Sequence, residues 1–161
     1  MARLAALKRA VGAASTLAAA ANAEGVDWTI LAAIGIYETG FLPKNESDGA
    51  GVGVGVFQIT NGGDTAMSFP WAADLAASML RDNLNQISKA LPNLSGVSLT
   101  QALADSWNLG AVGVINNIKA GLSPDYHSSP IYKNGHPSGQ YRGGGTGQYG
   151  SDILEIMDCF K

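Results

Sequence analysis

The spacing of hydrophobic residues predicts a chain that is mainly helical. Over residues 28–39, apolar positions follow helical spacing, and the stretch lies between Asp27, which suits the start of a helix, and Gly40, which suits its end. The longest such pattern runs over 69–91 and is followed by Pro92. These patterns predict a helix with one apolar stripe and a long core helix.

The second half of the chain carries signals for further helical segments. Ser98 can cap a helix over 99–108, which Gly110 would close, and another segment runs over 111–119. The second of these segments would end at Gly121. The sequence therefore predicts two consecutive helices that are separated at Gly110.

The C-terminal segment predicts one more helix. It is expected to begin at Ser151 or Asp152, because Asp152 and Glu155 can form a pair similar to a capping box. Its expected buried residues are Ile153, Met157 and Phe160. The single cysteine, Cys159, lies beside this apolar set and is expected to be a buried thiol without an internal disulfide.

The first 23 residues admit two interpretations. Arg3, Lys8 and Arg9 precede an alanine-rich stretch that ends in Ala-Asn-Ala, a pattern typical of a signal peptide. Alanine is also the best helix former, and the apolar residues fall mostly at helical spacing. We favour a structural helix over 1–23, in a chain where no apolar run is long enough to span a bilayer.

Two glycine-rich segments break the helical pattern. Gly and Val alternate over 51–56, and the segment continues to Ile59, which predicts a short extended or hairpin element whose valines share one face. Residues 122–147 are rich in Ser, Pro and Gly and are expected to form a long loop. The predicted fold is mainly α, with one small glycine-rich β element.

Length and charge narrow the possible functions. The 161 residues are enough for one compact domain, 1–161, without a metal or a disulfide framework. Ten Lys and Arg against thirteen Asp and Glu give a net charge of −3, so the basic stripe typical of nucleic-acid binding is missing. Asp125, His127 and His136 match no standard zinc spacing and are expected to be solvent-exposed polar residues. No metal and no cofactor is implied.

Glu38 is the carboxylate with the most distinctive setting. It lies at the C-terminal end of the helix predicted over 28–39, where the helix dipole disfavours a negative charge. The neighbouring Ile34, Tyr37 and Phe41 would also disfavour the ionised form. Both effects are expected to raise the pKa of Glu38, which suits a general acid.

Three ordered blocks resemble a known family. The first is Ile-Gly-Ile-Tyr-Glu-Thr-Gly-Phe over 34–41 with Ser-Asp-Gly-Ala over 47–50 and Gly-Val-Phe-Gln-Ile over 55–59. The second is Ser-Trp-Asn-Leu-Gly over 106–110, and the third is Tyr-Gly-Ser-Asp-Ile over 149–153. Together they resemble the lysozyme-like family of soluble lytic transglycosylases and goose-type lysozymes, glycoside hydrolase family 23.

The resemblance implies a lysozyme-like fold that cleaves the β-1,4 bond between N-acetylmuramic acid and N-acetylglucosamine in peptidoglycan. Glu38 matches the catalytic acid, and Gln58 would bind an N-acetyl sugar. Trp107 and Asn108 would supply a stacking face and a polar contact, and Tyr149 would close the far side of the cleft. The full implied substrate-binding set is Phe57, Gln58, Thr60, Trp107, Asn108 and Tyr149.

The second carboxylate departs from the family pattern. Asp48 is the candidate second catalytic residue, although it aligns with the family's acidic residue only across a gap. Thr60 stands where a further Asp often follows the Gln, and Asp64 is a weak substitute. With a base at roughly 6.5–9.5 Å from the acid, water attacks and the anomer inverts. Without one, the 6-hydroxyl of N-acetylmuramic acid attacks and leaves a 1,6-anhydro end.

Two alternatives accompany the peptidoglycan hypothesis. Chitin carries the same N-acetyl groups, and a chain at −3 lacks the positive surface that helps a free lysozyme reach anionic walls. A glycan-binding module without turnover is the non-enzymatic alternative. The expected location is secreted, periplasmic or delivered to the cell wall, with polysaccharide as the partner and no stable membrane insertion. An immunity or inhibitor protein is not identifiable from the sequence.

Overall fold

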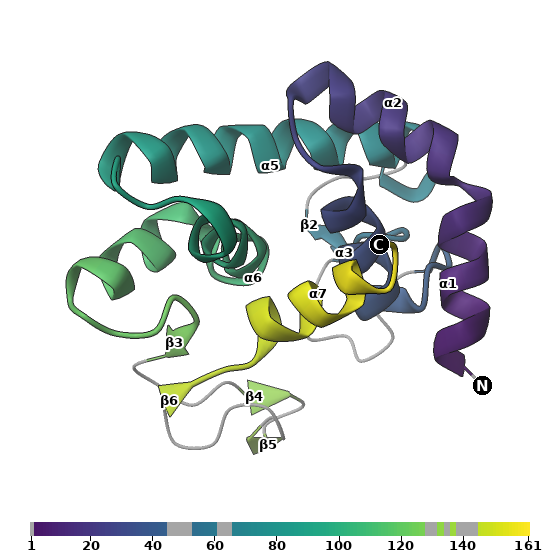
Figure 1. Ribbon diagram of the computed structural model, residues 1–161. Helices are drawn as coiled ribbons and strands as arrows, with labels where there is room; N and C mark the ends of the chain where they lie inside the picture. Colours follow the sequence, from purple (N-terminus) through teal and green to yellow (C-terminus); the bar gives the residue numbers. More distant parts are fainter. Residues whose placement is uncertain (1, 45–52, 61–65, 128–131, 134–135, 138–144) are drawn as a thin grey trace. The chain divides into compact units, whose positions relative to one another are not determined.

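The computed structural model describes residues 2–44, 53–60, 66–127, 132–133, 136–137 and 145–161 (Figure 1). The chain is mainly helical, as predicted. It divides into two compact units: Met1–Arg81 with Glu155–Lys161, and Asp82–Leu154. Within the described part of the chain, no helix combines the length and the apolar composition that crossing a bilayer requires.

Helix α3 (Trp28–Thr39) is the central helix of the first unit and has the predicted bounds. The Asp27 side chain accepts a hydrogen bond of 2.9 Å from the Thr29 N–H, which caps the first turn. Gly40 adopts the left-handed conformation (φ 66°) that ends the helix. All seven residues over 30–36 are buried, so the helix is enclosed on every side until its last turn.

The N-terminal segment is helical but forms two helices rather than the one predicted over 1–23. Helix α1 (Ala2–Gly12) and helix α2 (Ala14–Glu24) meet at Ala13, and both pack against α3 (Figure 1). Alanine and leucine provide the buried contacts: Ala6, Ala10, Leu17, Ala20 and Ala21. The small alanine side chains let these helices lie close to α3.

A two-stranded antiparallel hairpin follows α3 in the first unit. Strand β1 (Gly53–Val54) pairs with strand β2 (Ile59–Thr60), with Gly53 opposite Thr60. The predicted hairpin is confirmed, but the idea that the valines share one strand face is wrong for the described part. Val54 lies in β1, whereas Val56 is buried in the connection between the strands.

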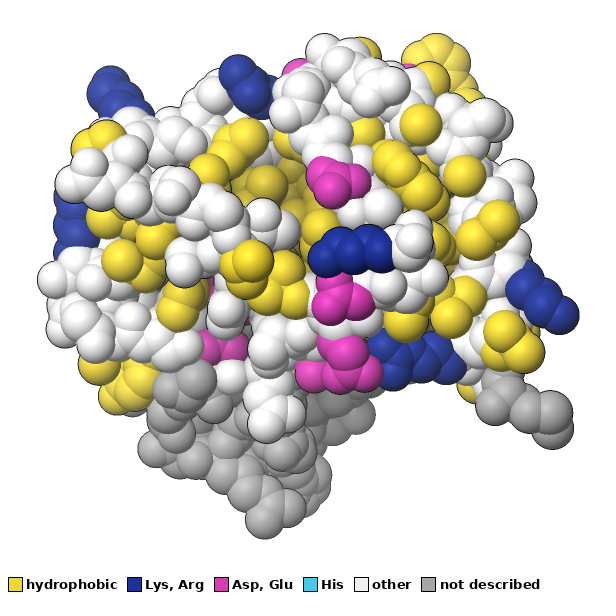
Figure 2. Space-filling view, in the orientation of Figure 1, with side chains coloured by type: hydrophobic (Ala, Val, Ile, Leu, Met, Phe, Trp, Pro, Cys, Tyr) yellow, Lys and Arg dark blue, Asp and Glu magenta, His cyan; other side chains and the backbone are white. Residues whose placement is uncertain are grey.

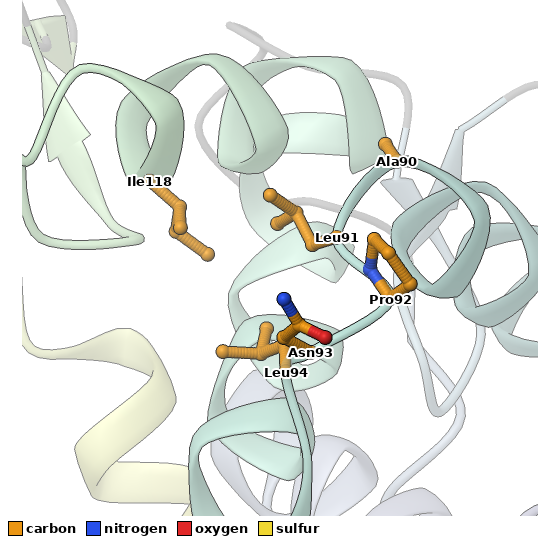
Figure 3. A pocket seen from close by; sticks show the side chains of 6 residues that line it. All are labelled: Ala90, Leu91, Pro92, Asn93, Leu94 and Ile118. Carbon is orange, nitrogen blue, oxygen red and sulfur yellow. The ribbon is translucent and has the colours of Figure 1, made fainter.

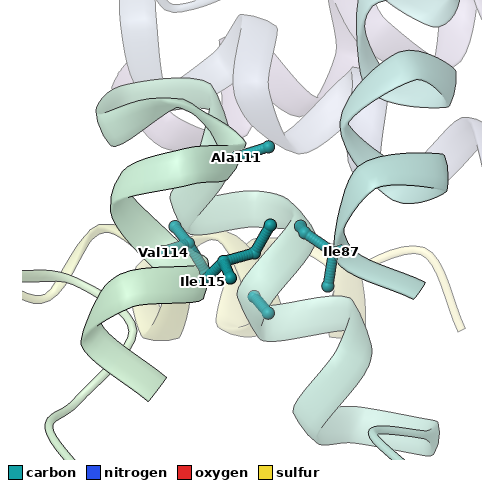
Figure 4. Packing of buried hydrophobic residues seen from close by; sticks show 5 residues of the cluster. Ile87, Ala111, Val114 and Ile115 are labelled. Carbon is teal, nitrogen blue, oxygen red and sulfur yellow. The ribbon is translucent and has the colours of Figure 1, made fainter. Parts of the chain in front are cut away.

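Helix α5 (Trp71–Ala90) is the predicted long helix, and helix α6 (Gly96–Lys119) follows it. The break predicted at Gly110 is confirmed as a kink with φ 76° and ψ 156°. The predicted start at Ser98 is wrong, since α6 begins at Gly96 directly after Ser95. Ile87 of α5 packs with residues from both sides of the kink (Figure 4): Ala102, Ala111, Val114 and Ile115.

The segment expected to be one long loop contains short strands. Strand β3 (Tyr126–His127) pairs with strand β6 (Gly145–Thr146), and strand β4 (Tyr132–Lys133) pairs with strand β5 (His136–Pro137). The expectation of a loop without secondary structure over 122–147 is therefore wrong for these residues. The remaining positions of the segment after His127 and before Gly145 lie outside the described residues.

Helix α7 (Tyr149–Asp158) begins two residues before the predicted start at Ser151. The Asp152 N–H donates to the Gln148 carbonyl over 2.9 Å, so the first turn already includes Tyr149. Cys159 is exposed, not buried as predicted. The ring of the next residue, Phe160, packs edge-on against Trp28, with centroids 5.2 Å apart.

Gly35 gives the first testable prediction, because a Cβ there would lie 2.8 Å from a ring carbon of Phe41 and 2.9 Å from a methyl carbon of Val56. Gly35→Ala is expected to lower the free energy of unfolding by about 1–3 kcal/mol through overpacking. Gly12→Ala is the matched helical control, since nothing lies within 4 Å of its Cβ position. It should be neutral or slightly stabilising. Equal urea denaturation curves for the two variants would contradict the prediction.

Candidate functional site

Glu38 lies in the last turn of α3, at the point where the helix leaves the core. Residues 30–36 are buried, whereas Tyr37 and Glu38 are half-buried. The side chain of Glu38 is therefore partly accessible, on a backbone that the core holds in place. This combination of a fixed backbone and a reachable carboxyl is what a group that acts on a bound substrate requires.

Thr39 attaches this helix end to the hairpin. Its hydroxyl lies 2.8 Å from the Val56 carbonyl oxygen and 3.1 Å from the Gly35 carbonyl oxygen, and its one proton can be donated to either. The same oxygen accepts a hydrogen bond of 3.1 Å from the Leu42 N–H. Thr39 is buried, so these contacts are shielded from water and fix the residue after Glu38.

Helix α1 contacts the same helix end through Arg9 in its last turn. The Arg9 guanidinium of α1 donates to the Gly40 carbonyl oxygen from Nε over 3.1 Å and from Nη2 over 2.7 Å. A cation at the C-terminal end of a helix also interacts favourably with the helix dipole. Arg9 therefore satisfies an end carbonyl two residues beyond Glu38.

Three phenylalanine rings, one of them from the hairpin, pack against one another. Phe41 lies edge-on to Phe57 and to Phe69, with centroids 6.4 Å and 5.8 Å apart, and Phe57 stacks on Phe69 at 6.3 Å. Phe57 has no exposed surface. The expectation that Phe57 contacts substrate is therefore wrong for its side chain, whose place in this cluster is a packing role.

Gln58 closes the turn of the hairpin. Its side-chain nitrogen donates to the Lys44 carbonyl over 2.7 Å and to the Gly55 carbonyl over 2.9 Å, and its backbone has a positive φ of 51°. Both amide protons are thus engaged with backbone, so the role expected for Gln58 in sugar binding falls to its oxygen. Thr60 is exposed at the end of β2. The proposed second carboxylates, Asp48 and Asp64, lie outside the described residues.

The other predicted site residues belong to the second unit. Trp107 is half-buried and Asn108 is exposed on α6, just before the kink at Gly110. Tyr149 is buried as the first residue of α7. The structure thus gathers Glu38 and the hairpin residues in one unit, and Trp107, Asn108 and Tyr149 in the other.

Asp105 is a buried residue of the second unit that the sequence did not single out. Its Oδ1 accepts a hydrogen bond of 2.6 Å from the Gly150 N–H, whereas its Oδ2 is buried with no hydrogen-bond partner among the described residues. The pKa of Asp105 is raised to about 7, chiefly by burial and also by the nearby Asp125, while the hydrogen bond from the Gly150 N–H opposes the shift. The one available signal was an acid in a run of small and apolar residues over 102–106.

Asp125 is also buried, which corrects the expectation that it is solvent-exposed. Its Oδ1 accepts a hydrogen bond of 2.8 Å from the Ser123 hydroxyl. The side chains of His127 and His136 lie outside the described residues. Among the side chains that the structure describes, no three His, Cys, Asp or Glu residues form a group able to hold a metal ion.

A pocket of about 400 Å³ lies between the end of α5 and the second half of α6 (Figure 3). Apolar side chains and one amide line it: Ala90, Leu91, Pro92, Asn93, Leu94 and Ile118. None of the predicted site residues is in this set, so the pocket is separate from the residues that the resemblance selects. Its lining contains no ionisable side chain and is suited to apolar contact.

Lys and Arg side chains are dispersed over the face shown in Figure 2, with acidic side chains between some of them. That face has no continuous basic surface in its described part.

In comparisons with known proteins, no family model matches the chain, and no curated protein matches it.

The raised pKa of Asp105 predicts a stability that falls with rising pH. The carboxyl is favoured in its neutral form by the folded state, so its contribution is complete below the ordinary value of 3.8 and is lost as the pH rises through about 7. Asp105→Asn removes this ionisation and keeps an oxygen for the Gly150 N–H. The advantage of the variant over wild type in unfolding free energy is expected to be larger at about pH 9 than at about pH 5, by an amount on the order of 1 kcal/mol.

Urea denaturation at both pH values measures this difference. Asp82→Asn is the control, since Asp82 is exposed on the same unit and water solvates either form. A difference between Asp105→Asn and wild type that is the same at both pH values would show that Asp105 does not ionise in this range.

Proposed function

We propose that the chain cleaves the β-1,4 bond between N-acetylmuramic acid and N-acetylglucosamine in peptidoglycan, with Glu38 as the general acid. The observation that carries the proposal is the setting of Glu38, a half-buried carboxyl on the last turn of a helix that is otherwise enclosed. Thr39 and Gly40, the two residues that follow it, are tied to the hairpin and to α1.

A general acid has to hold its proton and deliver it to one oxygen. The dipole of a helix disfavours a negative charge at its C-terminal end, where Glu38 lies, and this favours the protonated form. Donation of the proton to the glycosidic oxygen lets the bond to the leaving sugar break as the oxocarbenium-like transition state forms. The rigid anchoring of the helix end supports this role, since a misplaced donor loses catalytic power steeply.

The resemblance blocks supply the second line of support. Residues 34–41 form the end of α3, 55–59 form the turn of the hairpin and the start of β2, and 106–110 lead into the kink of α6. Residues 149–153 form the start of α7. The blocks over 34–41, 55–59 and 149–153 thus include the end or the start of an element, and the block over 106–110 lies at the kink inside α6.

Trp107 and Asn108 are suited to a sugar substrate. A sugar ring presents apolar C–H faces that stack on an indole ring, and its hydroxyl and N-acetyl groups bond to an amide. Both residues keep exposed surface on α6. We therefore propose Trp107 and Asn108 as sugar-contacting residues, and the bacterial cell wall as the place of action.

Mass spectrometry of the soluble products tests the proposal. Purified peptidoglycan is digested with wild type and with Glu38→Gln, which keeps the size of the side chain and removes the acid. We expect wild type to release disaccharide fragments and Glu38→Gln to lose at least about 100-fold of the rate, the lower range for a general acid. A 1,6-anhydro end would identify a lytic transglycosylase, and a reducing end one water heavier would identify a hydrolase.

Glu24→Gln is a matched control, because Glu24 also ends a helix, is half-buried and precedes a glycine with positive φ. It is expected to keep wild-type activity. Wild type that releases no fragments from peptidoglycan would overturn the proposal. Release from chitin alone would replace the substrate, and saturable binding without release would leave a glycan-binding module.

A further inference from the structure

We propose that Asp105 is a positioning residue of the glycan site, which holds the start of α7 with Tyr149 in register with the part of α6 that carries Trp107 and Asn108. The inference rests on the proposed function, because it assigns Trp107 and Asn108 to a sugar-binding surface. Asp105 precedes Trp107 by two positions and binds the backbone beside Tyr149. One side chain thus connects two of the resemblance blocks.

The contact between Asp105 and α7 leaves room for no other residue than glycine at position 150. Oδ1 accepts a hydrogen bond of 2.6 Å from the Gly150 N–H. A Cβ on Gly150 would clash with all three atoms of the Asp105 carboxyl group. The two residues are separated by 45 positions in the chain. An N–H in the first turn of a helix has no partner within the helix, so the carboxyl satisfies a group that would otherwise be buried and unpaired.

Ser106 fixes the same stretch of α6 from its next position. Its hydroxyl donates to the Leu103 carbonyl over 2.6 Å and accepts a hydrogen bond of 3.0 Å from the Asn83 side chain of α5. Both Asp105 and Ser106 are buried. Trp107 and Asn108 therefore follow two residues that are tied to α7 and to α5, so any movement of Asp105 displaces them.

The charge state of Asp105 links this arrangement to pH. Its Oδ2 is buried without a hydrogen-bond partner in the described part of the chain, and this oxygen can carry the proton. Among the described residues, two groups act on the carboxyl electrostatically: the Gly150 N–H of α7 and the buried Asp125, which is itself held by Ser123. Loss of the proton places a second negative charge beside Asp125, and neither of these two groups is a cation.

The consequence is a glycan affinity that depends on pH. Below about pH 7 the neutral carboxyl keeps the hydrogen bond to Gly150 without repulsion from Asp125. Above it, ionisation strains the contact between α6 and α7 and displaces the binding residues. Asp105→Asn keeps the acceptor and cannot ionise, whereas Asp105→Ala removes the acceptor at every pH.

Calorimetric titration of the full chain tests the inference. The Glu38→Gln variant is used as the parent to prevent turnover, and the probe is soluble, peptide-free glycan of alternating N-acetylglucosamine and N-acetylmuramic acid. We expect the parent to lose about tenfold in affinity between about pH 6 and about pH 9, the factor that one pKa unit of coupling represents. The added Asp105→Asn should bind within about twofold at both pH values, and Asp105→Ala should bind weakly at both.

Nitrogen-15 NMR of the Gly150 amide reports the ionisation of Asp105 independently of glycan binding, whereas the pH dependence of glycan affinity is the readout that a merely structural role would not move. Its chemical shift in the parent is expected to titrate with a midpoint near pH 7 and to stay constant in Asp105→Asn. Equal pH dependence of glycan affinity in the parent and in Asp105→Asn would overturn the inference and leave the proposed function standing. If the parent bound no glycan at any pH, both the inference and the proposed function would be overturned. This outcome differs from the previous one, because no variant would bind.

Discussion

The close approach of the hairpin to α3 at Gly35 is the constraint on which the first unit depends. Phe41 and Val56 occupy the space that any larger side chain at this position would need. Because they fit there, the chain can turn back after Gly40, and the Thr39 hydroxyl reaches the Val56 carbonyl. The position of the helix end that carries Glu38 is therefore set by packing that Glu38 itself does not make.

The elements that the sequence predicted well are those with local signals at both ends. The helix over 28–39 has a capping Asp27 and a terminating Gly40, and its bounds are those predicted. The N-terminal segment has no such capping pair: the only residue with low helix propensity at the break is Gly12, in a stretch otherwise rich in alanine, so the sequence predicts one helix where the structure has two. Ser98 has the residue type of a helix cap, and this local signal was misleading, because α6 begins at Gly96.

The candidate site was harder to predict, because burial and hydrogen-bond partners come from distant parts of the chain. Phe57 could contact a ligand or the core, and only its neighbours Phe41 and Phe69 decide that it belongs to the core. Asp105 acquires its partner from Gly150, which no pattern within one segment connects to it. Sequence spacing identifies which residues share a face, and it does not identify what closes over that face.

The two units hold their candidate residues by the same means but with different chemistry. In each, a buried side chain beside a candidate residue bonds to backbone of a distant segment: Thr39 to Val56, and Asp105 to Gly150. A hydroxyl does not ionise in the physiological range, so the anchoring of Glu38 does not depend on pH, whereas a carboxyl does ionise there. A general acid acts only in its protonated form. The proposed proton donor and the anchoring of the proposed sugar contacts therefore both favour the lower side of neutral pH.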